Sequence, residues 1–355
     1  MLRPLTTQLV GSYAKPSWLV RPERINAADR SWWRPEPDVV QIAREDAALL
    51  AIHDQERAGL DLLTDGEAQR QNYASHFFTR LRGIDMQNRA SLTRASEVST
   101  VTRRALGAEE EALRNAAPRI VGEIGWPGPL ALGEVRFLKR HTYKPVKATV
   151  VGPLTALNFL VDEYYRGEEA AAMALAAALN EELGALNAEG VDLLQIDEPA
   201  FHTRISWARR FGVRAINRMV AGITTPVVVH VCYGYAYFIE AKAPDPAYAE
   251  CLELLAACDI AGMSIEYEQP GHTPDLLTHC GDRHVILGLL NLGSDAAETP
   301  EHIAARLAAA LEVVPPERLH PAPDCGMWHL PREIAFAKVR ALVLGTEAVR
   351  LARGL

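Results

Sequence analysis

The sequence lacks the features that mark membrane, secreted and nucleic-acid-binding proteins. Its longest apolar stretches, such as residues 170–179, are about half the ~20 residues that a membrane-spanning helix needs. The opening MLRPLTTQLVGSY has no apolar run followed by a small-residue cleavage site. Its 37 Lys and Arg residues form no basic block and are outnumbered by 45 Asp and Glu residues, which disfavours nucleic acid and anionic membranes as partners. We therefore expect a cytoplasmic protein that binds neither.

Cysteine is scarce, with five residues at spacings that suggest no disulfide framework. Three of them, Cys251, Cys258 and Cys280, fall in or beside helical patterns and are expected to be buried as small apolar side chains. Cys232 and Cys325 differ, because each ends a β-rich run. We expect a chemical role for these two.

The chain also contains no Ser/Gly linker and no internal repeat, so we expect one domain over residues 1–355. A doubly wound dinucleotide-binding sheet is disfavoured, because no G-x-G-x-x-G motif follows the first predicted strand. The composition, 48% hydrophobic and 23% charged, is that of a folded globular protein.

Short β-branched runs alternate with Ala-, Leu- and Glu-rich helical patterns along the whole chain, which is typical of an α/β protein. The predicted strands are Gln8–Ser12, Leu60–Thr64, Ala148–Val151, Leu193–Ile196, Val227–Val231, Gly262–Glu266, Val285–Leu290 and Pro321–Asp324. Eight strand–helix units predict a (β/α)8 TIM barrel. The surplus length, approximately residues 85–146, predicts an insertion after the second strand. We expect a helix within residues 87–114 and an antiparallel β-hairpin over residues 119–138, around Gly-Trp-Pro-Gly-Pro.

Acidic and sulfur-bearing residues follow several predicted strands, where the chemistry of such a barrel takes place. His230 and Cys232 are two residues apart on one strand, so both side chains project to the same side. Cys325 and Glu266 end two other strands. One imidazole, two thiols and one carboxylate suit Zn²⁺ better than Mg²⁺ or Ca²⁺. We therefore predict a zinc site, with Glu268 as the alternative to Glu266 because it lies on the same strand face.

Seven short motifs lie along the chain, most of them at the ends of predicted strands. They are Val10-Gly11-Ser12, Asp65-Gly66-Glu67, Val151-Gly152-Pro153-Leu154-Thr155, Ile196-Asp197-Glu198-Pro199-Ala200, His230-Val231-Cys232, Ser264-Ile265-Glu266 and Pro323-Asp324-Cys325-Gly326. This combination resembles the catalytic C-terminal barrel of the cobalamin-independent methionine synthase family over almost the whole chain. The resemblance implies a zinc-dependent methyltransferase of methionine biosynthesis, which moves a methyl or small alkyl group to a thiol such as homocysteine.

The resemblance also assigns residues to roles. His230, Cys232, Glu266 and Cys325 take the positions of the family's zinc ligands, and zinc would convert the substrate thiol to a thiolate. Glu266 would be the ligand that yields to substrate sulfur.

Three further residues take positions that bind the amino-acid part of homocysteine: Ser12, Glu67 and Asp197. The two carboxylates suit an ammonium group, and the Ser12 hydroxyl suits a carboxylate. The alternative is that Glu67 and Asp197, with their acidic neighbours, cap the helices that follow.

The seventh strand departs from the folate-dependent enzymes of the family. Asn291 and Gly293 stand where those enzymes have an Asp and a His that is thought to be the general acid. A methylated folate nitrogen leaves poorly unless it is protonated. The methyl donor therefore stays open between a folate, a methylcorrinoid (free or on a partner protein) and, for a sulfonated thiol of the coenzyme M type, an epoxide. We predict His202 and Tyr233 as catalytic proton donors, with His76 and His329 as alternatives.

Overall fold

The computed structural model describes residues 3–94 and 97–355. Within these residues, no helix combines the length and the apolar character needed to cross a membrane.

A six-stranded parallel sheet forms the centre of the fold, in the order β11-β10-β9-β7-β6-β4. Its strands are β4 (Lys147–Val151), β6 (Leu193–Asp197), β7 (Val227–Val231), β9 (Gly262–Ile265), β10 (His284–Gly288) and β11 (Leu319–Ala322). Every residue of β4, β6 and β7 is buried, as expected of parallel strands that are covered on both faces.

Two more segments continue the parallel hydrogen bonding from one edge of this sheet to the other. The backbone N–H of Gln8 donates to the carbonyl of Pro321 in β11, and Gln8 forms a parallel bridge with Leu62. The neighbouring Leu63 bridges Val146, which precedes β4. Six strands and two bridging segments thus occupy the eight predicted strand positions, and the predicted α/β TIM-barrel class is confirmed.

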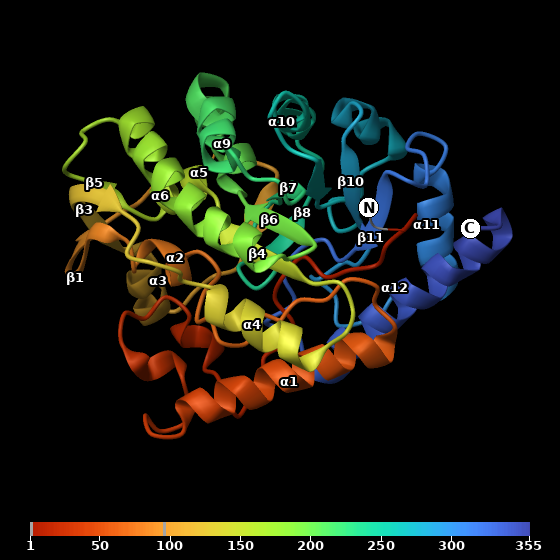
Figure 1. Cartoon of the computed structure of the whole chain (residues 1–355), viewed down its shortest axis with the longest axis horizontal. Helices are drawn as coiled ribbons and strands as arrows, with labels where there is room; N and C mark the ends of the chain where they lie inside the picture. The colour runs from red at the N-terminus through yellow and green to blue at the C-terminus, as the bar shows by residue number, and fades with distance from the viewer. Residues whose placement is uncertain (1–2, 95–96) are drawn as a thin grey trace.

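The longer helices lie around the sheet (Figure 1). The helices are α1 (Val40–Ala58), α2 (Ser75–Phe78), α3 (Ala108–Asn115), α4 (Leu132–His141), α5 (Pro153–Asn158), α6 (Glu168–Glu189), α7 (Ala200–Thr203), α8 (Ile205–Trp207), α9 (Val213–Val220), α10 (Pro246–Ala256), α11 (Pro300–Ala310) and α12 (Arg332–Arg353), with 3₁₀ turns η1 (Pro22–Arg24), η2 (Arg30–Trp32) and η4 (Pro274–Cys280) and a π-helical turn η3 (Ala208–Gly212). Both α10 and α11 begin with proline after a capping side chain, Asp245 and Thr299 respectively, which is the preferred chemistry of a helix start.

The insertion differs from the predicted one. Strand β3 (Ala116–Gly125) pairs antiparallel with β1 (Arg82–Ser91), and β5 (Val161–Asp162) adds to its other edge. These strands gather with α2 and α3 at one side of the barrel (Figure 1). The hairpin predicted over residues 119–138 is therefore wrong, because the partner of β3 lies upstream in the chain. The predicted helix occupies only the end of its range, as α3.

The Gly-Trp-Pro-Gly-Pro segment leads into α4 because a buried carboxylate fixes it. Glu182 of α6 accepts hydrogen bonds from the indole of Trp126 at 2.8 Å and from the backbone N–H groups of Leu130 and Ala131 at 2.9 and 2.8 Å. These contacts direct the chain from the end of β3 into a helix instead of a returning strand.

A second antiparallel ribbon joins the insertion to the barrel. Strand β2 (Val101–Arg103) pairs with β8 (Ile239–Lys242), a segment that follows β7. Through this pairing, β2 of the insertion lies beside the segment that follows barrel strand β7.

Replacing Glu182 with alanine should lower the free energy of unfolding by about 2–4 kcal/mol, because three donors lose their acceptor in a buried setting. Urea denaturation measures this effect. The matched control is Glu181→Ala, which removes an exposed carboxylate from the same helix and should change stability little. Equal stabilities of the two variants would contradict the anchoring role.

Candidate active site

Three soft ligand atoms converge where β7 and β11 end. The side chains of His230, Cys232 and Cys325 are buried, and their ligand atoms lie within 4.8 Å of one another. The two sulfurs are 3.7 Å apart, and all five cysteines are free. Two sulfurs bound to one tetrahedral zinc at ~2.3 Å each would be about 3.8 Å apart, so the observed spacing fits a zinc ion.

His230 is also oriented as a ligand would be. Its Nδ1 lies 3.0 Å from the hydroxyl of Ser264 on β9, while its Nε2 is buried without a hydrogen-bond partner among the described residues. A metal-bound histidine commonly has its second ring nitrogen fixed by such a contact. The unpartnered Nε2 is therefore the atom available to a metal.

The structure does not bring Glu266, the fourth predicted ligand, into this cluster. Its carboxylate accepts hydrogen bonds from the ammonium group of Lys242 at 2.6 Å and from the backbone N–H of Tyr233 at 2.8 Å. Lys242 lies on β8 and its side chain is almost fully buried. The alternative residue, Glu268, forms an ion pair with Arg306, and its carboxylate also lies 2.6 Å from His302 Nε2, so it is already engaged elsewhere.

The predicted substrate residues Ser12, Glu67 and Asp197 line one small pocket together with the three-ligand cluster. The volume of this cavity is about 40 Å³. The hydroxyl of Ser12 is buried without a partner among the described residues. A buried hydroxyl without a partner is costly, so it marks a position where a ligand group would be stabilised.

The backbone around Glu67 is shaped to place its carboxylate in this pocket. Glu67 has a left-handed conformation, with φ +50°, which a non-glycine residue rarely adopts. Its carboxylate accepts a hydrogen bond from Thr149 at 2.8 Å. Gly11 makes room for it, because a Cβ there would lie 2.5 Å from Glu67 Oε1. A side chain at position 11 would therefore displace this carboxylate from its place in the pocket.

Asp197 is the second carboxylate of the pocket. Burial, followed by the proximity of Glu67, raises its pKa to about 7. Gln195 donates a hydrogen bond to it at 2.7 Å. A cationic group placed between Glu67 and Asp197 would relieve their repulsion.

Glu198, next in the chain, holds the start of a helix that precedes it in sequence. Its carboxylate accepts hydrogen bonds from the backbone N–H groups of Leu154 and Thr155 at the start of α5. The capping alternative concerned the helix that follows, α7, whose N-cap residue Pro199 makes no side-chain hydrogen bond. It therefore does not describe the contacts of Glu198, and the Asp197 carboxylate lines the pocket.

The two predicted proton donors lie outside the described lining of the pocket. His202 is fully buried and packs against Tyr233 and Tyr248, and the hydroxyl of Tyr233 lies 3.0 Å from His272 Nε2.

Sequence reasoning missed two phenols that do line the pocket, Tyr73 and Tyr235, whose rings meet edge to face at 5.6 Å. Tyr235 follows the His-x-Cys motif by three residues, which is the only signal that pointed to it.

Gly293, which follows the seventh predicted strand (β10), lies against the side chain of Gln269. A Cβ on Gly293 would lie 2.4 Å from the side-chain nitrogen of Gln269, and Asn291 Oδ1 accepts from the Gly293 N–H. Nearby, His329 is buried, and this burial lowers its pKa to about 4. His76 lies 3.2 Å from Glu134.

The barrel and its pocket, with imidazole and thiol groups beside paired carboxylates, define an α/β-barrel protein with a candidate zinc–thiol site. The family model described as the catalytic domain of cobalamin-independent synthase matches residues 5–348. The chain belongs to this family, which confirms the resemblance seen in the motifs.

Individual relatives span nearly the same length. The chain is 29% identical over 350 residues to a methionine synthase of Sulfurisphaera tokodaii, covering 98% of this chain and 93% of that one. It is 31% identical over 356 residues to a methionine synthase of Saccharolobus solfataricus, covering 98% and 95%. The solved structure of a B12-independent methionine synthase from Shewanella sp. W3-18-1, in complex with selenomethionine, superposes with a TM-score of 0.85 at 28% identity and covers 99% of both chains.

The buried carboxyl of Glu198 should make stability depend on pH. Burial raises its pKa from 4.5 to about 7, so between these values the folded chain keeps a proton that the unfolded chain has lost. Raising the pH from about 5 to about 8 should therefore lower the unfolding free energy of the wild type by about 2–3 kcal/mol more than that of Glu198→Gln. Urea denaturation at each pH tests this. Glu181→Gln should follow the wild type, and parallel pH curves for wild type and Glu198→Gln would contradict the prediction.

Proposed function

We propose that this protein is a zinc-dependent enzyme that transfers a methyl group to the sulfur of homocysteine and thereby forms methionine. The observation that carries the proposal is the convergence of His230, Cys232 and Cys325 in the same pocket as Glu67 and Asp197. In this proposal, the thiol of homocysteine would react beside the three predicted metal ligands. Its amino group would bind between the two carboxylates in the same pocket.

His230, Cys232 and Cys325 would hold the zinc ion, with Glu266 as the fourth, exchangeable ligand. A zinc ion there would lower the pKa of an incoming thiol, so that the sulfur reacts as a thiolate near neutral pH. The pairing of Glu266 with Lys242 supports the exchange, because it provides a place where the carboxylate is stabilised when it is not on the metal.

The remaining residues of the pocket would position the amino acid. The carboxylates of Glu67 and Asp197 would accept hydrogen bonds from the substrate ammonium group, and the unpartnered hydroxyl of Ser12 would donate to its carboxylate. The related Shewanella enzyme was solved with selenomethionine, a selenium counterpart of methionine. A product-like ligand in a close structural relative supports an amino-acid substrate here.

The possible methyl donors differ in whether their leaving group must be protonated. A methylcorrinoid leaves without protonation, which suits a site whose seventh strand offers Asn291 and Gly293 in place of an acid. A methylated folate, whose nitrogen must be protonated, would need its proton from another group of the pocket, such as Tyr73 or Tyr235, and the turnover assays below decide between the two donors.

The second candidate function is the opening of an epoxide by a sulfonated thiol. The observation that favours it is the presence of Tyr73 and Tyr235 on the pocket wall. Burial raises the pKa of both phenols, so both keep the proton that an opening epoxide oxygen would accept.

Turnover assays separate these functions. Zinc-loaded protein is offered homocysteine or a sulfonated thiol, each with methylcobalamin, methyltetrahydrofolate or a small epoxide. Methionine formed from homocysteine would support the first function and identify its donor. Turnover of the epoxide with the sulfonated thiol alone would replace it with the second.

Replacing Cys325 with serine should remove zinc and activity together, because the site loses one of its two thiolates. We expect about one zinc ion per wild-type chain and a strongly reduced content in Cys325→Ser, measured by elemental analysis. Cys258→Ser, at a buried cysteine outside the cluster, should keep its zinc. Absence of zinc from the wild type after anaerobic zinc addition would overturn the metal assignment.

Replacing Lys242 with methionine should strengthen zinc binding and weaken thiol binding, because Glu266 loses its alternative partner. We expect zinc retention against a chelator to rise by about tenfold and the KM for homocysteine to rise as well. Lys139→Met, at a lysine whose ammonium group donates to the backbone carbonyls of Glu189 and Gly190, should leave both unchanged. Faster zinc loss from Lys242→Met would contradict the exchange role.

A further inference from the structure

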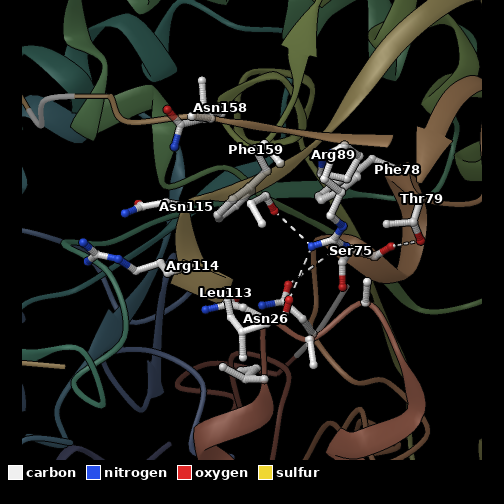
Figure 2. Close-up of a pocket in the computed structure, with 18 of the residues that line it drawn as sticks. Asn26, Ser75, Phe78, Thr79, Arg89, Leu113, Arg114, Asn115, Asn158 and Phe159 are labelled. Atoms are coloured by element: carbon white, nitrogen blue, oxygen red, sulfur yellow. Dashed lines mark hydrogen bonds between the residues drawn. The ribbon is translucent and has the colours of Figure 1, made fainter. Parts of the chain in front are cut away.

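A separate cavity lies between the insertion and the barrel. Its volume is about 350 Å³, and its walls come from residues 25–28, the segment around α2, strands β1 and β3, the end of α3 and residues 158–159. Figure 2 shows Arg89 on one side of it, Asn115 on the opposite side and Asn158 with Phe159 above. We call this cavity the arginine pocket.

The charge of the arginine pocket has one sign. Five arginines line it: Arg89, Arg94, Arg103, Arg114 and Arg204. Among the described residues that line it, none is an aspartate or a glutamate, although the whole chain has a net charge of −8. Arg114 pairs with Glu111, and Glu97 and Glu168 lie close enough to Arg204 to raise its pKa against the effect of burial. Five arginines beside these three glutamates leave an excess of positive charge at the walls.

Several of these guanidinium groups have unused donors. Arg89 donates through one nitrogen to the carbonyls of Asn26 and Ala116, while its Nε is buried and has no partner in the described part of the chain. Within the same residues, Arg103 forms no side-chain hydrogen bond or ion pair. Carbonyl oxygens are neutral, so the contacts of Arg89 do not balance its charge.

Arg94 and Arg204 form a second group on the wall. Arg94 donates to the carbonyls of Leu157 and Leu160, and both guanidinium groups lie over the ring of Trp207, at 5.1 and 5.6 Å from its centre. This arrangement fixes two like charges beside one another. An anion between such groups would receive charge-assisted hydrogen bonds.

The pocket also has features of a small-molecule site. Phe78 and Phe159 stack at 6.0 Å on its wall, next to the neutral polar side chains of Asn26, Ser75 and Asn158. Its volume lies within the range of cavities that hold small ligands. A concave site of this size suits a small molecule better than the surface of a protein partner.

We propose that the arginine pocket binds a small molecule that carries several phosphate or carboxylate groups. The size of the cavity and the positive charge of its walls support this proposal, and the pKa values of its buried arginines agree with it. Burial lowers the pKa of Arg89, and lowers that of Arg94 to about 10. A bound anion would offset this cost of holding charge away from water.

The arginine pocket is distinct from the candidate active site. The two cavities share no lining residue in the described chain, but they lie on either side of one segment: Asn72 lines the first and Tyr73 the second. In the β2–β8 ribbon, β2 carries Arg103 at the arginine pocket, and β8 carries Lys242, the ion-pair partner of Glu266. A ligand in the arginine pocket would therefore touch segments that also form the active site.

Isothermal titration calorimetry on the full, zinc-loaded chain tests the proposal. The probes are inorganic tripolyphosphate, adenosine triphosphate and a linear triglutamate peptide, with the zinc content measured before and after each titration. Tighter binding of the two phosphate probes would identify a phosphate ligand, and tighter binding of triglutamate a carboxylate ligand. Absence of binding for all three would overturn the proposal.

Charge-matched variants show whether the arginine pocket is the site. Arg89→Gln combined with Arg103→Gln should weaken binding of the preferred probe by about tenfold or more. Arg103→Gln alone should weaken it less, and it replaces an exposed side chain of β2. The control is Arg209→Gln combined with Arg210→Gln, which removes the same charge from two exposed arginines and should leave the affinity near the wild-type value. Equal weakening by both double variants would overturn the assignment, because it would show attraction to the overall charge only.

Discussion

Parallel pairing of β7 with β9, and of β10 with β11, is the constraint on which the candidate active site depends. In parallel strands the carboxyl ends lie at the same edge, so residues that directly follow the strands face a common mouth. Cys232 and Cys325 are separated by 93 positions in sequence, yet their sulfurs are 3.7 Å apart. The backbone hydrogen bonds between the barrel strands therefore bring the ligand atoms together.

The same mouth concentrates negative charge, and the fold offsets it locally. Lys242 neutralises Glu266, Gln195 donates to Asp197, and Thr149 donates to Glu67. The balance is incomplete, because burial still raises the pKa of Asp197 to about 7. Such incompletely satisfied groups cost stability in the free protein and favour a ligand that completes them.

The insertion contributes to the barrel mouth in addition to enlarging the chain. Its β2 strand pairs with β8, and β8 supplies the lysine that holds Glu266. Its β1 and β3 strands form part of the arginine pocket on the other side of the segment around α2. The insertion thus lines a charged cavity and also contacts, through the hydrogen bonds between β2 and β8, the strand that carries Lys242.

The sequence by itself determined the barrel class, the family and the residues at the strand ends, because strand–helix alternation and short ordered motifs are local properties of the chain. Only the tertiary structure decided which side chains meet. Strand β3 pairs with β1, which lies earlier in the chain, and the turn at Trp126 is held by Glu182 of α6. Neither contact can be read from residues 119–138 alone, which favoured a hairpin that does not form. Lys242 competes for Glu266, and Tyr73 and Tyr235 reach the pocket while His202 and Tyr233 do not. These outcomes depend on contacts between distant segments, whose geometry is fixed by packing and not by local spacing.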